Sequence, residues 1–529
     1  MAENKRNVWM PIIFSLILML GIFIGFELRD KTGYGSIFAK PSSSSVAEVL
    51  KLIESRYVDK VPVDSISTNV INQLLASLDP HSSFIPAEEL TDVNDEIMGN
   101  FQGIGIEYQI INDSLNVMNL LPDGPAKKSG ILVGDIFIKA NDSILLTGKT
   151  IKPDDIRKYL RGVTGSTINI TLFRNGQLVK VSILRSVISI PSVDAAYLAD
   201  PQTGYIHINK FTERTHLEFM KSLDSLQKLH MKKLVLDLRG NGGGLMNEAT
   251  KIADEFLSGE KLIVYTEGLH SKRINYTCQK DGMFEEGKLI VLVDETSASS
   301  SEVLTGALQD WDRATIVGRR SYGKGLVQQQ FMLSDGSAVR LTTAKYFTPL
   351  GRNIQKPYNK DKAQYKEEIY TRYHSTNPSQ NYDSTKHNSK TYKTPAGHIV
   401  YGGGGITPDY SIPLDTNIYH SIYARLLEKD NLNVFAYKWY LQNKKIISPV
   451  KNIASLITVI SNNSTWWNSL VEFSKKGGID MSKATDKDKK MIENYLQSFI
   501  ARIELNKSAA AQISNQQDDT ILKAMELLK

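Results

Sequence analysis

Residues 288–310 read KLIVLVDETSASSSEVLTGALQD, and this stretch decides the fold of the middle of the chain. Its continuous apolar start predicts a buried β-strand, and its apolar end predicts a helix. Serine suits caps and turns better than helix interiors, so the polar run between them predicts a helix cap in which Glu302 completes a capping box. That interpretation explains one serine of the run and leaves open what the others do; the four are Ser297, Ser299, Ser300 and Ser301.

Alternating strands and helices continue on both sides of this stretch, over residues 188–414. The strand candidates are GYIHI, KLVLDLRG, KLIVLVDE, ATIVG and SAVRLTTAKYF, and the helical candidates between them include HLEFMKSLDSLQKL and LMNEATKIADEFL. This alternation predicts an α/β core with a mixed sheet, whose loops at the strand ends can carry chemistry. Residues 356–393 have little apolar content and predict an exposed insertion within this core.

Three polar or glycine-rich segments stand at strand ends of this core: DLRGNGGGLM at 237–246, TSASSSE at 296–302 and SYGKGLVQQQ at 321–330. A nucleophilic serine needs a base and backbone donors for the oxyanion. Lys324 lies between two glycines, and a lysine buried away from water loses its charge readily and can act as a general base. The GNGGG run lacks the GK[ST] ending of a phosphate-binding P-loop.

The three segments, in this order, resemble the carboxy-terminal processing proteases, a family of Ser/Lys peptidases with an inserted PDZ domain. In that family the nucleophile is the middle serine of an S-A-S-A-S-E pattern, and the lysine of an F-G-K-G-x-V-Q pattern follows 25 positions later. The same spacing here (324 − 299 = 25) selects Ser299 and Lys324. The supporting glutamine of the family falls on Gln328, four positions after the lysine.

The resemblance implies an oxyanion hole made by the amide of Ser300 and by Gly243 or Gly244, and it does not choose between the two glycines. Two residues depart from the family pattern. Ser300 replaces alanine and adds a hydroxyl beside the nucleophile, and Tyr322 replaces phenylalanine, a change that we expect to be harmless.

Further matches are YFTPLGRNIQ and GGGGITPD, so the resemblance covers residues 46–413. The nine histidines leave a Ser/His/Asp arrangement formally open, although His81, in LDPHSSF, is expected to order a turn.

Residues 99–187 change to short alternating β segments with two helical stretches, GPAKKSG and IKPDDIRKYLRG, which predicts a small, partly open barrel. FQGIGIEY and GPAKKSGILVGDIFIKAND resemble the carboxylate-binding loop and the segment after the first helix of PDZ domains. The resemblance implies that a peptide with a free carboxylate adds a strand at the loop formed by Gly103, Ile104, Gly105 and Ile106.

The N-terminal residues 1–30 hold a run of 19 residues without charge, 8–26, preceded by Lys5 and Arg6. That length and the basic flank predict an uncleaved membrane anchor, with a cleaved signal peptide as the alternative, and place the remainder outside the cytoplasm, in the periplasm of a two-membrane bacterium. A linker at 31–45 and a small helical region at 46–98 follow. Within that region, residues 46–78 predict two short amphipathic helices.

Residues 415–529 are helical and amphipathic, which predicts a C-terminal appendage for packing or for homo-oligomerisation. The formal charge of +6 is too small to indicate nucleic-acid binding, and the single cysteine excludes an intramolecular disulfide. No Cys/His cluster suggests a metal site, and the chemistry implied by the resemblance needs no cofactor.

We therefore expect a membrane-anchored serine endopeptidase that captures C-terminal tails of exported proteins, alone or through an adaptor protein, and cleaves them through an acyl-enzyme. Two alternatives stay open. One is a catalytically silent PDZ scaffold, which only the serine at position 300 favours; the other is a Ser/Lys hydrolase of non-peptide acyl substrates, for which a PDZ domain has no obvious use.

Overall fold

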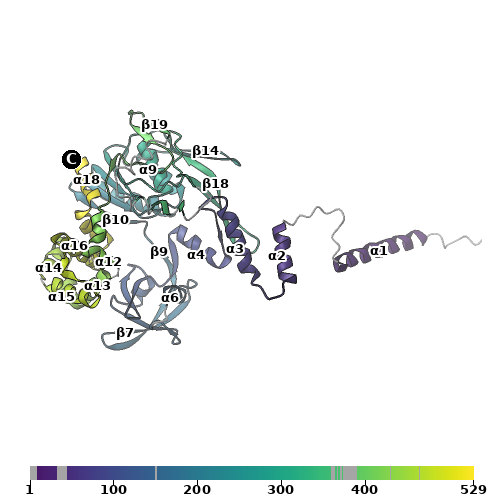
Figure 1. Cartoon of the computed structure of the whole chain (residues 1–529), viewed down its shortest axis with the longest axis horizontal. Coiled ribbons are helices and arrows are strands. Elements are labelled where there is room, and N and C mark those ends of the chain that lie inside the picture. Colours follow the sequence, from purple (N-terminus) through teal and green to yellow (C-terminus); the bar gives the residue numbers. More distant parts are fainter. Residues whose placement is uncertain are drawn as a thin grey trace, which may run out of the picture. The chain divides into compact units, whose positions relative to one another are not determined.

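A computed structural model describes residues 9–32, 45–148, 152–358, 364–365, 367–369, 372, 390–428, 431–463 and 465–529 (Figure 1). The chain divides into two compact units, residues 1–74 and residues 75–529. The predicted linker at 31–45 lies almost wholly outside the described residues, as does most of the predicted insertion at 356–393.

The first unit is helical. Its helices are α1 Met10–Thr32, α2 Ser45–Arg56 and α3 Val63–Ala76, the last of which ends in the second unit. The two short helices predicted for residues 46–78 are confirmed. Among the described residues no helix is both long enough and apolar enough to cross a bilayer, so the predicted anchor at 8–26 is not supported.

The core at residues 188–414 is built on a six-stranded sheet in the order β10-β11-β12-β15-β16-β21. The first pair is antiparallel and the others are parallel, so this sheet is mixed, as predicted. Its strands are β10 Val193–Asp200, β11 Thr203–Ile208, β12 Lys233–Asp237, β15 Lys288–Val293, β16 Thr315–Gly318 and β21 Tyr410–Ser411.

Helices cover both faces of this sheet. The helices α7 Thr215–Lys228, α8 Met246–Asp254 and α9 Ser300–Asp310 enclose one core, which takes Leu234 and Leu236 from β12. The intervening Val235 packs with Ile521 and Leu528 of the last helix in a core on the opposite face. Alternate residues of one strand therefore enter different cores, because side chains alternate across a sheet that is buried on both faces.

The helices on the second face are α17 Lys507–Ser514 and α18 Asp519–Leu528, separated by the 3₁₀ turn η3 Asn515–Gln517. Figure 1 shows α18, at the labelled C-terminus, beside the strands of the core. Residues 415–529 are helical as predicted, but this end of them completes the α/β core. The description of the whole region as an appendage is therefore wrong for α18, because its apolar residues form one cluster with those of the central strands.

A second, antiparallel sheet holds the strand predicted at 337–347, so the described part of the core contains more than the one predicted sheet. The order is β1-β18-β13-β14, with β17 pairing along β18. Its strands are β1 Ser83–Ile85, β13 Leu262–Gly268, β14 Ser271–Thr277, β17 Leu326–Met332 and β18 Ala338–Phe347. A strand pattern shows which faces are buried but not which strands become partners, so the sequence could not separate the two sheets.

The barrel predicted at 99–187 is present. Its sheet has the order β3-β4-β5-β7-β8, with β6 pairing with β5. The elements are β2 Asn100–Gly103, β3 Ile106–Ile111, β4 Ser114–Leu120, α5 Pro125–Lys128, β5 Ile136–Ala140, β6 Ile144–Leu145, α6 Pro153–Leu160, β7 Thr167–Arg174, β8 Gln177–Leu184 and β9 Ser186–Ser189. The short β2–β9 pair brings the two ends of this segment together. The segment is therefore inserted into the rest of the fold at one place.

The remaining elements are α4 Ala87–Met98, the hairpin β19 Thr391–Lys393 and β20 Ile399–Tyr401, and a group of C-terminal helices. These helices are η1 Thr416–His420, α12 Ile422–Glu428, α13 Asn431–Ile447, α14 Ile453–Asn462, α15 Thr465–Lys476, η2 Met481–Lys483 and α16 Asp486–Glu504. From α12 onward they enclose an apolar core of their own, which includes Trp439 and Leu496.

Candidate active site

Ser299 follows β15 and caps the N-terminus of α9, where the sequence places it. Its backbone has φ 54° and ψ −112°, a conformation that residues with a side chain rarely adopt. Backbone strain of this kind persists only where neighbouring contacts hold it, and it concentrates at active sites. Ser299 is therefore the residue of the serine run whose backbone indicates a special role.

The glycine-rich loop that follows β12 lies directly against this turn. A Cβ added to Gly243 would come within 2.8 Å of Ser299 Cβ and 3.0 Å of the backbone nitrogen of Ser300. Gly243 also has a φ of +98°, in the region that favours glycine. The structure thus brings together the predicted nucleophile and the predicted oxyanion glycines.

The backbone amides at this contact differ in their partners. Gly243 N–H donates to Asn241 Oδ1 at 2.9 Å and is engaged. Gly243 C=O accepts from Phe211 N–H at 3.0 Å, and because the two polar groups of a planar peptide point in opposite directions, Gly244 N–H points away from Phe211. Neither Gly244 N–H nor Ser300 N–H has a partner among the described residues. The geometry therefore favours Gly244 over Gly243 as a donor.

Glu302 joins the serine loop to the lysine loop. Its side chain is 1% exposed, and its Oε2 accepts from the N–H groups of Ser299 and Lys324, both at 2.9 Å. Its Oε1 accepts from Gly323 N–H at 2.7 Å and from the hydroxyl of Ser321. Burial raises the pKa of Glu302, and these donors oppose the rise. A capping box was the only role that the sequence indicated for Glu302, because nothing in the pattern links it to a loop 20 residues away.

Lys324 is partly buried, and its Nζ donates to Gln328 Oε1 at 3.0 Å. Burial lowers the pKa of Lys324, the charge of Arg340 lowers it further, and the carboxylates of Glu302 and Asp79 oppose both effects. A lysine with a lowered pKa carries a free lone pair at lower pH than an exposed one. The site therefore suits a lysine that accepts a proton.

A turn in the N-terminal part of the second unit fixes the orientation of Gln328. Gln328 Nε2 donates to the backbone carbonyl of His81 at 2.6 Å, which leaves Oε1 to face Lys324. Asp79 Oδ1 holds this turn by accepting from His81 N–H at 2.7 Å and from the next N–H at 2.8 Å. The turn exists as predicted, but Asp79 orders it, and the imidazole of His81 instead lies 3.1 Å from the hydroxyl of Tyr365.

Tyr346 forms a further tie between the two loops. Its side chain is 2% exposed, and its hydroxyl lies 3.1 Å from the carbonyl oxygen of Ser299 and within hydrogen-bond distance of the carbonyl oxygen of Lys324. It comes from β18, in the YFTPLGRNIQ match. No sequence pattern indicated a role for this tyrosine, because the contact depends on how the second sheet is placed.

Lys356, Tyr365 and Arg372 of the predicted insertion pack against the lysine loop. Lys356 is 3% exposed and donates to the carbonyl of Tyr365 and to Glu368 Oε2, both at 2.9 Å. Arg372 donates to the carbonyl of Ser321 at 2.8 Å. Exposure was therefore the wrong expectation for Lys356 and Tyr365, which are buried because they stack and pair with the loop that precedes Lys324.

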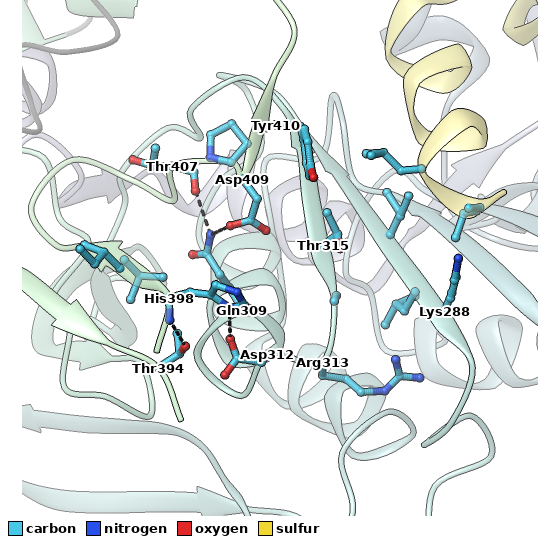
Figure 2. A pocket seen from close by; sticks show the side chains of 18 of the residues that line it. Lys288, Gln309, Asp312, Arg313, Thr315, Thr394, His398, Thr407, Asp409 and Tyr410 are labelled. Carbon is cyan, nitrogen blue, oxygen red and sulfur yellow. Dashed lines mark hydrogen bonds and ion pairs between the residues drawn. The ribbon is translucent and has the colours of Figure 1, made fainter. Parts of the chain in front are cut away.

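A cavity of about 820 Å³ lies at the opposite end of the central sheet. Its lining includes Lys288 and Thr315, at the amino ends of β15 and β16, whereas the serine and lysine loops follow their carboxyl ends. In Figure 2, Gln309 and Asp409 point toward each other, and Gln309 Nε2 donates to Asp409 Oδ1 at 3.1 Å. Asp409 Oδ2 also accepts from Ile316 N–H of β16 at 2.7 Å, so this carboxylate is engaged by the sheet. Because it lies at the other end of the strands, the cavity is separate from the catalytic candidates.

The predicted peptide-binding loop lies at the start of β3, an edge strand that pairs with β4 alone among the described strands. Ile104 is 2% exposed, and its carbonyl accepts from Ala126 N–H at 2.8 Å, which anchors the loop to α5. Ile104 and Ile106 belong to one apolar cluster with Ile156 and Leu160 of α6. The outer edge of β3 and the apolar face of α6 thus suit an added peptide strand.

Comparison with known proteins agrees with this arrangement. Residues 202–362 match peptidase family S41, residues 102–184 match the PDZ domain, and residues 422–504 match a family of unknown function. A carboxy-terminal-processing protease of Bartonella bacilliformis is 37% identical over 58% of this chain and 71% of its own length. A probable CtpA-like serine protease of Staphylococcus epidermidis is 33% identical over 67% of this chain and 73% of its own length.

Among solved structures, the photosystem II D1 C-terminal processing protease is 27% identical, covers 70% of this chain and 87% of its own, and has a TM-score of 0.35. The PDZ match contains the predicted carboxylate loop, and the S41 match contains the glycine, serine and lysine loops. The chain therefore belongs to peptidase family S41 and is a carboxy-terminal-processing serine protease with a PDZ domain.

Proposed function

We propose that Ser299 is the nucleophile of this protease, that Lys324 is its general base and that Gln328 orients the lysine. The observation that carries the proposal is the buried carboxylate of Glu302, which accepts from the N–H groups of both Ser299 and Lys324 through one oxygen. One atom thereby fixes the serine loop relative to the lysine loop.

In the proposed reaction, the neutral amine of Lys324 takes the hydroxyl proton of Ser299 as the oxygen attacks the peptide carbonyl. The N–H groups of Gly244 and Ser300 stabilise the negative oxygen of the tetrahedral intermediate. Lys324 returns the proton to the leaving amine as the peptide bond breaks, which leaves an acyl ester on Ser299. Water then attacks the ester as Lys324 takes one of its protons, and Lys324 passes that proton to the departing Ser299 oxygen, which releases the new chain end and restores the serine hydroxyl and the neutral lysine.

We propose further that the PDZ domain captures the C-terminal tail of the substrate beside β3. Support comes from the edge position of β3 and the ordered Ile104 loop. Tethering one end of the substrate raises the local concentration of the adjoining chain at Ser299. That the substrates are exported proteins stays a prediction from the apolar run at residues 8–26.

The test is cleavage of an unfolded protein with an apolar C-terminal tail by the full chain, with product masses measured over time. Ser299→Ala and Lys324→Ala are compared with Lys345→Ala, which removes an exposed lysine of β18. We expect the first two variants to lose cleavage at least a thousandfold and the control to stay within about twofold. Cleavage by Ser299→Ala at the rate of the unmodified chain would reject the assignment.

A catalytically silent scaffold gains no support from the structure. The serine at position 300 was the feature that favoured it, and the Ser300 hydroxyl donates to the carbonyl of Gly244 at 2.8 Å. The hydroxyl is therefore engaged with the glycine loop, and the Ser300 N–H remains a donor.

A further inference from the structure

The three serines that flank the nucleophile all bind the glycine-rich loop. Each hydroxyl donates to a backbone carbonyl of that loop, and each side chain is at most 1% exposed. The bonds run from Ser297 to Leu238 at 2.8 Å, from Ser301 to Asn241 at 2.9 Å and from Ser300 to Gly244 at 2.8 Å. The hydroxyls of the serine run therefore connect the nucleophile loop to the loop of the proposed oxyanion glycines by hydrogen bonds.

The three bonds reach different parts of that loop. The carbonyl of Leu238 precedes the glycines, and the carbonyl of Asn241 also accepts from Ala298 N–H at 3.0 Å, so it keeps a partner without Ser301. Only the hydroxyl of Ser300 reaches the glycine that supplies a proposed oxyanion donor.

Gly244 needs such a restraint. It has a φ of +140° and no side chain to limit its backbone, so hydrogen bonds to its two neighbouring peptide units help to fix its conformation. Phe211 holds both units from one side, because its N–H donates to Gly243 C=O and its C=O accepts from Leu245 N–H at 2.8 Å. Ser300 holds the second unit from the other side. Without the hydroxyl, this unit would be fixed on one side only.

We propose that the Ser300 hydroxyl is a positioning group that sets the separation of the two oxyanion donors. Ser300 provides one donor through its own N–H, and it restrains Gly244, which carries the other donor, through the carbonyl of the following peptide unit. This inference rests on the proposed function, and it gives the departure from the family's alanine a role in the transition state. The hydroxyl itself does not contact the substrate.

The first variant is Ser300→Ala, and the matched control is Ser301→Ala, which also removes one buried hydroxyl that donates to the same loop. Three quantities are measured for each full-length chain: kcat and KM on a fluorogenic peptide, the affinity for a peptide boronate, and the melting temperature. The boronate forms a tetrahedral adduct on a nucleophilic serine, so its affinity reports on the oxyanion hole.

We expect Ser300→Ala to lower kcat roughly tenfold, less than the loss of a whole oxyanion donor, and to weaken boronate binding by a similar factor with KM within about twofold. Ser301→Ala should melt at a similarly lowered temperature with kcat and boronate affinity nearly unchanged. Equal kcat in Ser300→Ala and the unmodified chain would overturn the inference, as would equal losses of kcat in both variants. If the unmodified chain cleaves no faster than Ser299→Ala, the proposed function itself fails, and the inference fails with it.

Discussion

Replacing Glu302 by glutamine disturbs the alignment of the serine and lysine loops but leaves the side chains of Ser299 and Lys324 unchanged. The carboxylate accepts four hydrogen bonds, two on each oxygen, whereas an amide replaces one accepting oxygen with a donor. Two donors then face an NH₂ group. At about 1.5–3 kcal/mol for each bond to a charged acceptor, the loss is about 3–6 kcal/mol, offset in part because a buried charge disappears. We expect a net loss of about 2–4 kcal/mol in the free energy of unfolding.

Part of this loss falls on the alignment of Ser299 with Lys324. If about 2.7 kcal/mol is lost from transition-state stabilisation, kcat falls about a hundredfold. The assay is peptide cleavage under saturating substrate beside thermal melting of the same samples. Glu255→Gln is the control. Glu255 is equally buried and accepts from Met283 N–H at 3.1 Å, and it belongs to neither the serine loop nor the lysine loop. A Glu302→Gln enzyme that keeps kcat within about threefold, with a melting temperature lowered as in the control, would refute the reasoning.

Three further outcomes are expected. Arg340→Gln removes a positive charge that lowers the pKa of Lys324, so the pKa rises and the ascending limb of the kcat/KM–pH profile should move to higher pH; a shift to lower pH would contradict the electrostatics. Gly244→Ala places a Cβ 2.0 Å from a backbone oxygen and should reduce kcat at least a hundredfold, whereas Gly242→Ala meets open space and should stay within about twofold. Asp518→Ala removes the cap of α18 and should lower the free energy of unfolding by about 1–2 kcal/mol in urea titrations, a change that an unaltered midpoint would disprove.

The local course of the chain at the site could be predicted from the sequence. The strand, cap and helix at residues 288–310 follow from apolar spacing and from the capping preference of serine. The 25-residue spacing of the family that the chain resembles then selected Ser299 and Lys324, whose backbone N–H groups both donate to Glu302 in the structure.

The supports of the site could not be predicted, because they depend on contacts between distant residues. Gln328 and the carbonyl of His81 are 247 positions apart, and Tyr346 reaches the loops from a sheet that strand patterns alone could not separate from the first. The glycine loop was recognisable as a whole, but only the partners of Gly243 and Gly244 distinguish an engaged amide from an available one.

The position of α18 has a consequence for how the protease comes into existence. Ribosomes make this helix after the strands it covers, so a nascent chain that has reached residue 506 still exposes one apolar side of β11, β12 and β15 to solvent. The N-cap of this helix, Asp518, also lies 2.7 Å from Arg239, in the glycine-rich loop. The fold of the catalytic domain can therefore be complete only after α18 has been made and has packed on the central strands.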